Sequence, residues 1–170
     1  MPNQVFDTVR TVMAVRDFQN KPVPDDVVNR IVEAGRLTAS GSNQQPWHFV
    51  VVRDRANLQQ LGSLVKTGPY TAKAAFAIIA AYEEASPLGI SDVSRAIQSM
   101  ILTAWADGVG SNWTGFSGLD HVRNTFGLPD RYDVVGVLPF GYPARAMKGL
   151  KKRKPLQDVA SAERYGQPLP

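Results

Sequence analysis

Apolar residues recur along the chain at two spacings, and these spacings predict its helices and strands. Steps of three and four residues predict helices over residues 4–13, 24–37, 57–66 and 119–126. Short apolar runs predict strands over residues 47–52, 74–82 and 134–140. The run at 74–82 also suits a buried helix, and we favour a strand because it is short and contains paired isoleucines. Pro139 should lie at the edge or the end of the last strand.

The strongest helical pattern lies in the middle of the chain. Ser91 and Asp92 resemble an N-cap, and apolar residues then repeat at steps of three and four as far as Gly108. This segment is predicted to be the central core helix. Beyond Pro143 the apolar pattern fades, so an ordered tail would have to lie on its own domain or on a partner subunit.

Composition narrows the class of protein. A chain of 170 residues with 44% apolar and 20% charged residues should form one globular domain. There is no cysteine, which excludes disulfides, thiolate nucleophiles and cysteine-ligated metal sites. His48 and His121 are the only histidines and lack metal-ligand spacing, so no metal site is expected.

The N-terminal stretch carries Asp7, Arg10 and Arg16, which interrupt any signal-peptide core. No segment has the roughly 18 apolar residues that a membrane span needs. We therefore expect a soluble, cytoplasmic protein.

The net charge of +4 is concentrated near the C-terminus. Five of its cations lie close together in the sequence: Lys148, Lys151, Lys152, Arg153 and Lys154. Such a cluster can be a solvated or nucleic-acid-attracting tail, or it can hold an anionic group such as a phosphate. No zinc, helix-turn-helix or RNA-binding signature accompanies it, so nucleic-acid binding is the weakest alternative.

The segment from Ala39 to Trp47 carries the most chemical information. It reads A-S-G-S-N-Q-Q-P-W, between a predicted helix and a predicted strand. Its hydroxyls, amides and backbone can present hydrogen-bonding groups to a planar heterocycle. An ordinary polar turn would have a similar composition.

Several motifs in order along the chain resemble the FMN-dependent nitroreductase family. S-G-S-N-Q-Q-P-W is similar to the flavin-binding signature of that family, and V-R-D-F and P-V-P precede it. G-V-G-S-N-W-T-G-F, G-Y-P and K-R-K-P-L follow it. The resemblance covers nearly the whole chain. It favours a heterocycle-binding role for the polar segment and an anion-binding role for the basic cluster.

The resemblance implies which residues would bind FMN. Ser40, Gly41 and Asn43 would contact the ribityl chain and the ring, with Gln45 as a further candidate. Thr114 and Gly115 correspond to the loop that brings a backbone N–H near the flavin N5. Thr114 stands where relatives often have an acidic residue.

The resemblance also implies a phosphate site formed by Arg16, Lys151 and Arg153, because a phosphate needs cationic partners. Residues 12–14 depart from the family pattern, since Val-Met-Ala replaces a segment that usually begins with arginine. Arg10 is a possible substitute. Lys66 and Lys73 are alternatives for a positive group beside the flavin N1.

The fold that the resemblance implies is α+β, with a mostly antiparallel sheet, helices on both faces, and a C-terminal arm from about residue 144 exchanged onto a homodimer partner. The implied function is hydride transfer from NAD(P)H through FMN to a nitroaromatic, quinone or other electrophile by a ping-pong mechanism. No catalytic side chain and no metal are expected. Two alternatives remain: another flavin enzyme on this scaffold, or a non-enzymatic flavin- or deazaflavin-binding module.

Overall fold

The computed structural model describes residues 3–116, 118–147 and 151–170. Its centre is a four-stranded antiparallel sheet in the order β1-β2-β4-β3. The strands are β1 (Trp47–Val52), β2 (Phe76–Glu83), β3 (Gly110–Ser111) and β4 (Tyr132–Gly141). The long strands β2 and β4 lie inside the sheet, and most of their residues are buried on both faces.

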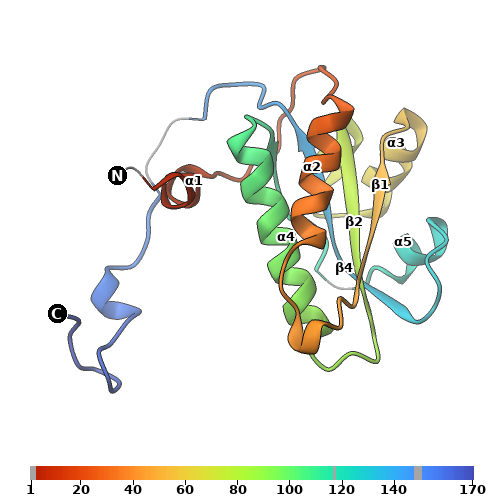
Figure 1. Cartoon of the computed structure of the whole chain (residues 1–170). Helices are drawn as coiled ribbons and strands as arrows, with labels where there is room; N and C mark the ends of the chain where they lie inside the picture. Colours follow the sequence, from red (N-terminus) through yellow and green to blue (C-terminus); the bar gives the residue numbers. More distant parts are fainter. Residues whose placement is uncertain (1–2, 117, 148–150) are drawn as a thin grey trace.

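Helices cover the two faces of this sheet. α2 (Asp25–Arg36) and α4 (Gly89–Ala106) pack side by side on one face, and α3 (Arg55–Leu64) and α5 (Asp120–Thr125) cover the other (Figure 1). α1 (Gln4–Thr11) lies beside α4, away from the sheet. Three short 3₁₀ turns complete the elements: η1 (Gly41–Asn43), η2 (Pro69–Lys73) and η3 (Leu156–Asp158).

Strand β2 divides the core in two because successive side chains point to opposite faces. Phe76 and Ile78 pack with α2 and α4, whereas Ala77 and Ile79 pack with α3 and α5. All four side chains are fully buried. Phe76 also stacks on its cross-strand partner Phe140, with ring centroids 4.9 Å apart. A strand buried on both faces has no alternation of polar and apolar residues, and this explains its continuous apolar run.

A register shift in the pairing of β2 with β4 changes which residues of β4 share a face. The shift lies at Ala80 and Ala81 of β2. As a result Val134 and Val137 face α3 and α5, while Leu138 faces α2 and α4. Pro139 lies near the end of β4, and β3 stops before the residue that would pair with it.

The α+β architecture with its antiparallel sheet is confirmed, and so are the predicted elements, with shifted boundaries. β1 has the predicted bounds, and α1 ends at Thr11 instead of residue 13. The predicted cap of the central helix was wrong. α4 begins at Gly89, two residues before Ser91, and Asp92 lies fully buried inside its first turn.

The C-terminal segment 151–170 extends away from the sheet on the side of α1 (Figure 1). Its apolar side chains Leu156, Val159 and Tyr165 are exposed. Lys148, the first cation of the basic cluster, lies outside the described residues. None of the helices in the described ranges is long and apolar enough to cross a membrane.

Candidate functional site

A cleft of about 800 Å³ opens between α1, the second half of α4, and the start of the C-terminal segment. Its volume is in the range of about 300–1,000 Å³ that small-molecule and cofactor sites occupy. Residues from four stretches of the chain line it, among them Arg10, Val12, Trp105, Trp113 and Lys151. This cleft is therefore the first candidate for a ligand site.

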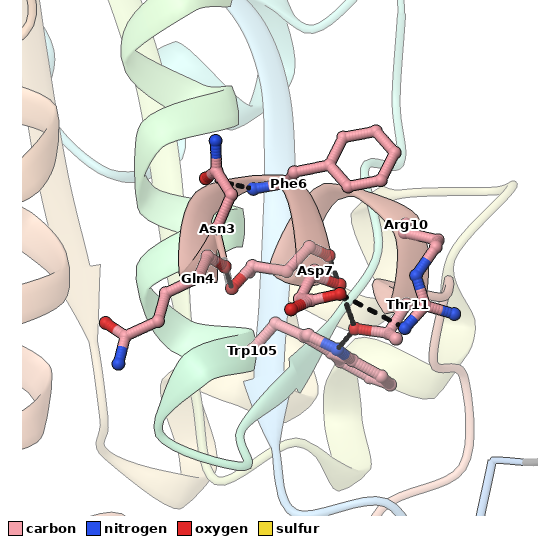
Figure 2. A network of polar contacts seen from close by, with 8 residues as sticks. Asn3, Gln4, Phe6, Asp7, Arg10, Thr11 and Trp105 are labelled. Atoms are coloured by element: carbon pink, nitrogen blue, oxygen red, sulfur yellow. Dashed lines mark hydrogen bonds and ion pairs between the residues drawn. The ribbon is translucent and has the colours of Figure 1, made fainter. Parts of the chain in front are cut away.

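A hydrogen bond joins the wall that α1 forms to α4, and further polar contacts lie within α1 (Figure 2). The indole N–H of Trp105 donates to Thr11 Oγ1 at 3.1 Å, and Asn3 caps the helix by accepting from the Phe6 N–H at 3.0 Å. Arg10 pairs with Asp7, one turn earlier, at 3.2 Å. Phe6 points away from Trp105 and is 62% exposed, so α1 is held by polar contacts rather than by burial.

Three cations of the described residues line the cleft: Arg10, Lys151 and Arg153. The Lys151 ammonium donates to the Val9 carbonyl at 2.6 Å, in the last turn of α1, where the helix dipole favours a positive charge. Partial burial, followed by the charge of Arg153, lowers the pKa of Lys151. Removing an ammonium from water beside a second cation disfavours its charged form, and a bound anion would reverse that effect.

The side chains of Asn112 and Trp113 form another wall of the cleft. The Asn112 side chain donates to the Trp113 carbonyl at 3.2 Å and also bonds the Tyr70 hydroxyl. The Trp113 indole lies against β4 at Gly136, where a Cβ would approach its Nε1 to 2.2 Å. Gly136 thus makes room for the indole, which also stacks on Phe116 with centroids 6.0 Å apart. This wall offers flat apolar surface next to hydrogen-bonding groups.

The predicted flavin loop, Ser40–Gln45, lies elsewhere, at the N-terminal end of α4. The cleft contacts α4 at Gln98, Ile101 and Trp105 instead. Asp92 and Trp105 are about 20 Å apart along the helix axis at 1.5 Å per residue. Within one chain, therefore, the loop and the cleft lie at opposite ends of α4.

The backbone of this loop is strained and held from inside. Ser42, Asn43 and Gln45 have φ angles of 49°, 56° and 53°, in the left-handed region that residues other than glycine adopt at a cost. Asp92, fully buried, accepts a hydrogen bond from the Gly41 N–H at 3.0 Å and pairs with Arg95. The Gln45 N–H donates to Ser40 Oγ at 2.9 Å. The loop is thereby fixed in one shape, with its amide side chains exposed.

Thr114 and Gly115 lie beside a third region, next to η2. Thr114 is 1% exposed, and its hydroxyl is 2.9 Å from that of Thr67. The Gly115 N–H donates to Thr67 Oγ1 at 3.2 Å, so this predicted flavin donor already has a partner inside the chain. Gly115 also lines a pocket of about 690 Å³ together with Lys66 and Phe116.

Arg16 is exposed in a small pocket of about 290 Å³ that adjoins the cleft. Ala14 and Met147 line both hollows. Lys73 is exposed at the end of η2 and lines neither of them. The nine predicted cofactor residues thus fall into separate groups, of which only Lys151 and Arg153 lie in the cleft itself.

Three residues of the cleft were missed or given little weight in the sequence analysis: Arg10, Trp105 and Asn112. Asn112 lies inside the G-S-N-W-T-G-F motif, so the motif itself could have indicated it. Trp105 belongs to the predicted core helix and gave no separate signal. Over the described ranges, no group of three or more His, Cys, Asp or Glu residues could hold a metal ion.

Comparisons with known proteins agree with this architecture. The sequence profile of the Nitroreductase family matches residues 9–91 and 69–142. A protein of Methanothermobacter thermautotrophicus, named NADH dehydrogenase/NAD(P)H nitroreductase, is 30% identical over 148 residues, covering 82% of this chain and 78% of its own length. A protein of Staphylococcus aureus, named NADPH-dependent oxidoreductase, is 25% identical and covers 97% of this chain and 75% of its own length.

Solved structures extend the likeness to the whole fold. A crystal structure of a protein named NADH dehydrogenase/NAD(P)H nitroreductase from Bacteroides thetaiotaomicron superposes with a TM-score of 0.88 at 30% identity, covering 98% of this chain and 99% of that one. An FMN-dependent nitroreductase from Clostridium difficile shares the fold with a TM-score of 0.87 at 20% identity, covering 94% of this chain and 99% of that one. The motifs, the fold and these relatives lead to one conclusion: the chain belongs to the nitroreductase family, and relatives of it are oxidoreductases by name.

Proposed function

We propose that this protein is an FMN-dependent oxidoreductase that takes hydride from NAD(P)H and delivers it to a nitroaromatic, a quinone or another electrophilic acceptor. FMN, when bound, supplies the redox chemistry, because its N5 accepts and releases hydride. Donor and acceptor would use the same place in turn, so the kinetics should be ping-pong. NAD(P)H is a cytoplasmic metabolite, and we place the proposed reaction in the cytoplasm.

The observation that carries this proposal is the composition of the cleft. Arg10, Lys151 and Arg153 could bind a phosphate, and Asn112 and Trp113 add an amide and an indole to the same lining. An elongated ligand with an anionic end and a planar heterocyclic end matches this arrangement. The donor set therefore fits FMN.

The residues of the chain would bind and orient the cofactor rather than take part in covalent chemistry. Lys151 and Arg153 would neutralise the phosphate, with Arg16 reaching in from the adjoining pocket. Gly115 would direct its N–H to the ring once Thr67 gives up the hydrogen bond that it now accepts. No general acid or nucleophile of the protein is required, so the protein contributes orientation and electrostatics.

We further propose a homodimer in which each flavin lies between two subunits. The Ser40–Gln45 loop lies at the far end of α4 from the cleft, so a loop from a second copy would have to complete the site. Val5 and Phe6 on α1 are 70% and 62% exposed, and α1 has no buried residue. Segment 151–170 is the proposed C-terminal arm. Lying on a partner subunit would remove its exposed apolar side chains from water.

A second candidate function is a flavin- or deazaflavin-binding module without enzyme activity. The observation that favours it is the apolar lining of the cleft at Val12, Met13 and Ala14, where family members usually carry a basic residue. Without that basic residue the protein would bind the flavin phosphate less tightly, and this departure from the family pattern favours the module.

The first experiment is to extract and identify the bound cofactor of the purified protein. We expect a yellow protein that releases FMN, bleaches with NADPH under anaerobic conditions, and recovers its colour on addition of a nitroaromatic. A protein that binds a flavin but is not bleached by NADPH or NADH would favour the binding module. A colourless protein that cannot be reconstituted with FMN would refute the flavoprotein proposal.

A further inference from the structure

The end of α1 and the start of the C-terminal segment bring three cations to one cleft. Arg10 lies in the last turn of α1, and Lys151 is tied to the carbonyl of the residue just before it, Val9, at 2.6 Å. Arg153 lines the same cleft and contributes to the lowered pKa of Lys151. Arg10 is more than a hundred positions from Lys151 and Arg153 in the sequence, so the fold adds it to the charge run of the tail.

The lining of this cleft contains no Asp or Glu among the described residues. The ion-pair partner of Arg10 is Asp7, and both side chains are largely exposed, at 60% and 51%. Exposed pairs of this kind contribute little to stability. Arg10 can therefore exchange Asp7 for another anion at small cost.

Val12, Met13 and Ala14 follow directly after α1 and line the cleft with apolar side chains. The helix ends at Thr11, and Val12 turns the chain into an extended conformation, with φ −55° and ψ 133°. The extended segment thus presents no cation, whereas the last helical turn presents Arg10. A positive group is still available at this end of the cleft, two residues earlier in the chain.

We propose that Arg10 is a phosphate-binding residue of this protein and takes the place of the basic residue that is missing at positions 12–14. With Lys151 and Arg153 it forms a three-cation site for a phosphate monoester, the terminal phosphate of the flavin mononucleotide. This inference rests on the proposed function. A guanidinium can donate two parallel hydrogen bonds to a phosphate, which gives Arg10 a role that a simple point charge would fill less well.

The test compares FMN with riboflavin, which differ by the phosphate alone. Both ligands are titrated by flavin fluorescence into the full-length protein after flavin removal, as wild type, Arg10→Gln, Arg10→Lys and Arg131→Gln. Arg131 is the matched control: its change removes the same charge from an exposed arginine that lies over the Tyr132 ring and does not line the cleft. Because α1 has no buried residue, Arg10→Gln should fold normally, and circular dichroism checks this.

We expect wild type to prefer FMN over riboflavin, and Arg10→Gln to lower that preference about 10-fold or more, since it removes a charge-assisted hydrogen bond to the phosphate. Riboflavin affinity should stay unchanged, Arg10→Lys should recover part of the preference, and Arg131→Gln should behave as wild type. An unchanged preference in Arg10→Gln, or a wild type that binds both flavins equally, overturns the role of Arg10 while leaving the flavoprotein proposal intact. A wild type that binds neither flavin overturns both.

Discussion

At the scale of single residues, Asp92 shows what a sequence pattern can and cannot reveal. Its position after Ser91 resembled a helix cap, but the structure buries it completely within α4, where it accepts the Gly41 N–H. The residues around it gave no sign of this, because the bond joins positions 51 apart in the chain. A buried carboxylate needs such partners, and here the partner belongs to the strained loop at Ser40–Gln45.

We predict that Asp92→Ala lowers the free energy of unfolding by about 1–3 kcal/mol, because it leaves the Gly41 N–H without its acceptor. It should also weaken flavin retention, since three residues of the loop lose the support that holds their left-handed conformations. Asp92→Asn keeps an oxygen acceptor, so it should lower the free energy of unfolding and the flavin retention by less. Urea denaturation and flavin content measure the two effects.

Asp26→Ala is a suitable control for this series, because Asp26 is 72% exposed and pairs with Arg30 on the surface of α2. Its effect on unfolding should be below about 1 kcal/mol. If Asp92→Ala were no more harmful than Asp26→Ala, the loop would not depend on Asp92.

Only part of the candidate site could be predicted from the sequence, because the rest also depends on contacts between residues far apart in the chain. The order of the motifs along the chain identified the polar loop and the cations Lys151 and Arg153. The residue types at these positions indicate their chemistry. The sequence could not indicate that Ser42, Asn43 and Gln45 adopt positive φ, since none of them is glycine. Nor could it bring Arg10 next to Lys151, because that proximity depends on where the tail returns to α1.

At the scale of elements, the sequence predicted where strands and helices lie along the chain better than it predicted how they pack together. β1 has the predicted bounds because its short apolar run is enclosed by Pro46 and by a charged segment. β2 was harder, since a strand buried on both faces has no period of two in its polarity. Which β2 side chains face which helices depends on tertiary packing alone.

We predict that Ile78→Ala lowers the free energy of unfolding by about 2–5 kcal/mol, because Ile78 is fully buried between the sheet and the α2–α4 pair. Val51→Ala, on edge strand β1, should cost less than about 1 kcal/mol, since Val51 is 37% exposed. Urea titrations of both variants measure the difference. Equal losses would contradict the buried position of Ile78.

At the scale of the whole molecule, large apolar side chains lie exposed on two neighbouring segments. α1 and segment 151–170 expose Phe6, Leu156 and Val159, at 62%, 65% and 64%. The Ser40–Gln45 loop and the cleft lie at opposite ends of α4. The sparse apolar pattern after Pro143 already predicted that the tail needs a surface to lie on. It could not identify that surface, because both its own domain and a partner satisfy the same pattern.

We predict that the 170-residue chain forms a dimer, with twice the 18.6 kDa mass of one chain in light scattering or sedimentation. Replacing both Leu156 and Val159 by aspartate should weaken the dimer and lower flavin content together, because charges would enter an apolar interface. The control replaces Gln157 and Ser161 by aspartate, which adds the same charge to the same segment without removing apolar surface. The first variant should dissociate at a higher protein concentration than the control, which sedimentation measures.

Dimer dissociation and flavin content together distinguish the possible positions of the C-terminal arm. If the arm lies on a partner and the partner's loop completes the cleft, dissociation and flavin loss should follow the same concentration dependence in the Leu156 and Val159 variant, because one interface serves both. A stable dimer that loses flavin would restrict the arm to its own subunit's cleft. A full-length protein that is monomeric and retains flavin would show that a single chain forms the site, and the Ser40–Gln45 loop would then have no part in it.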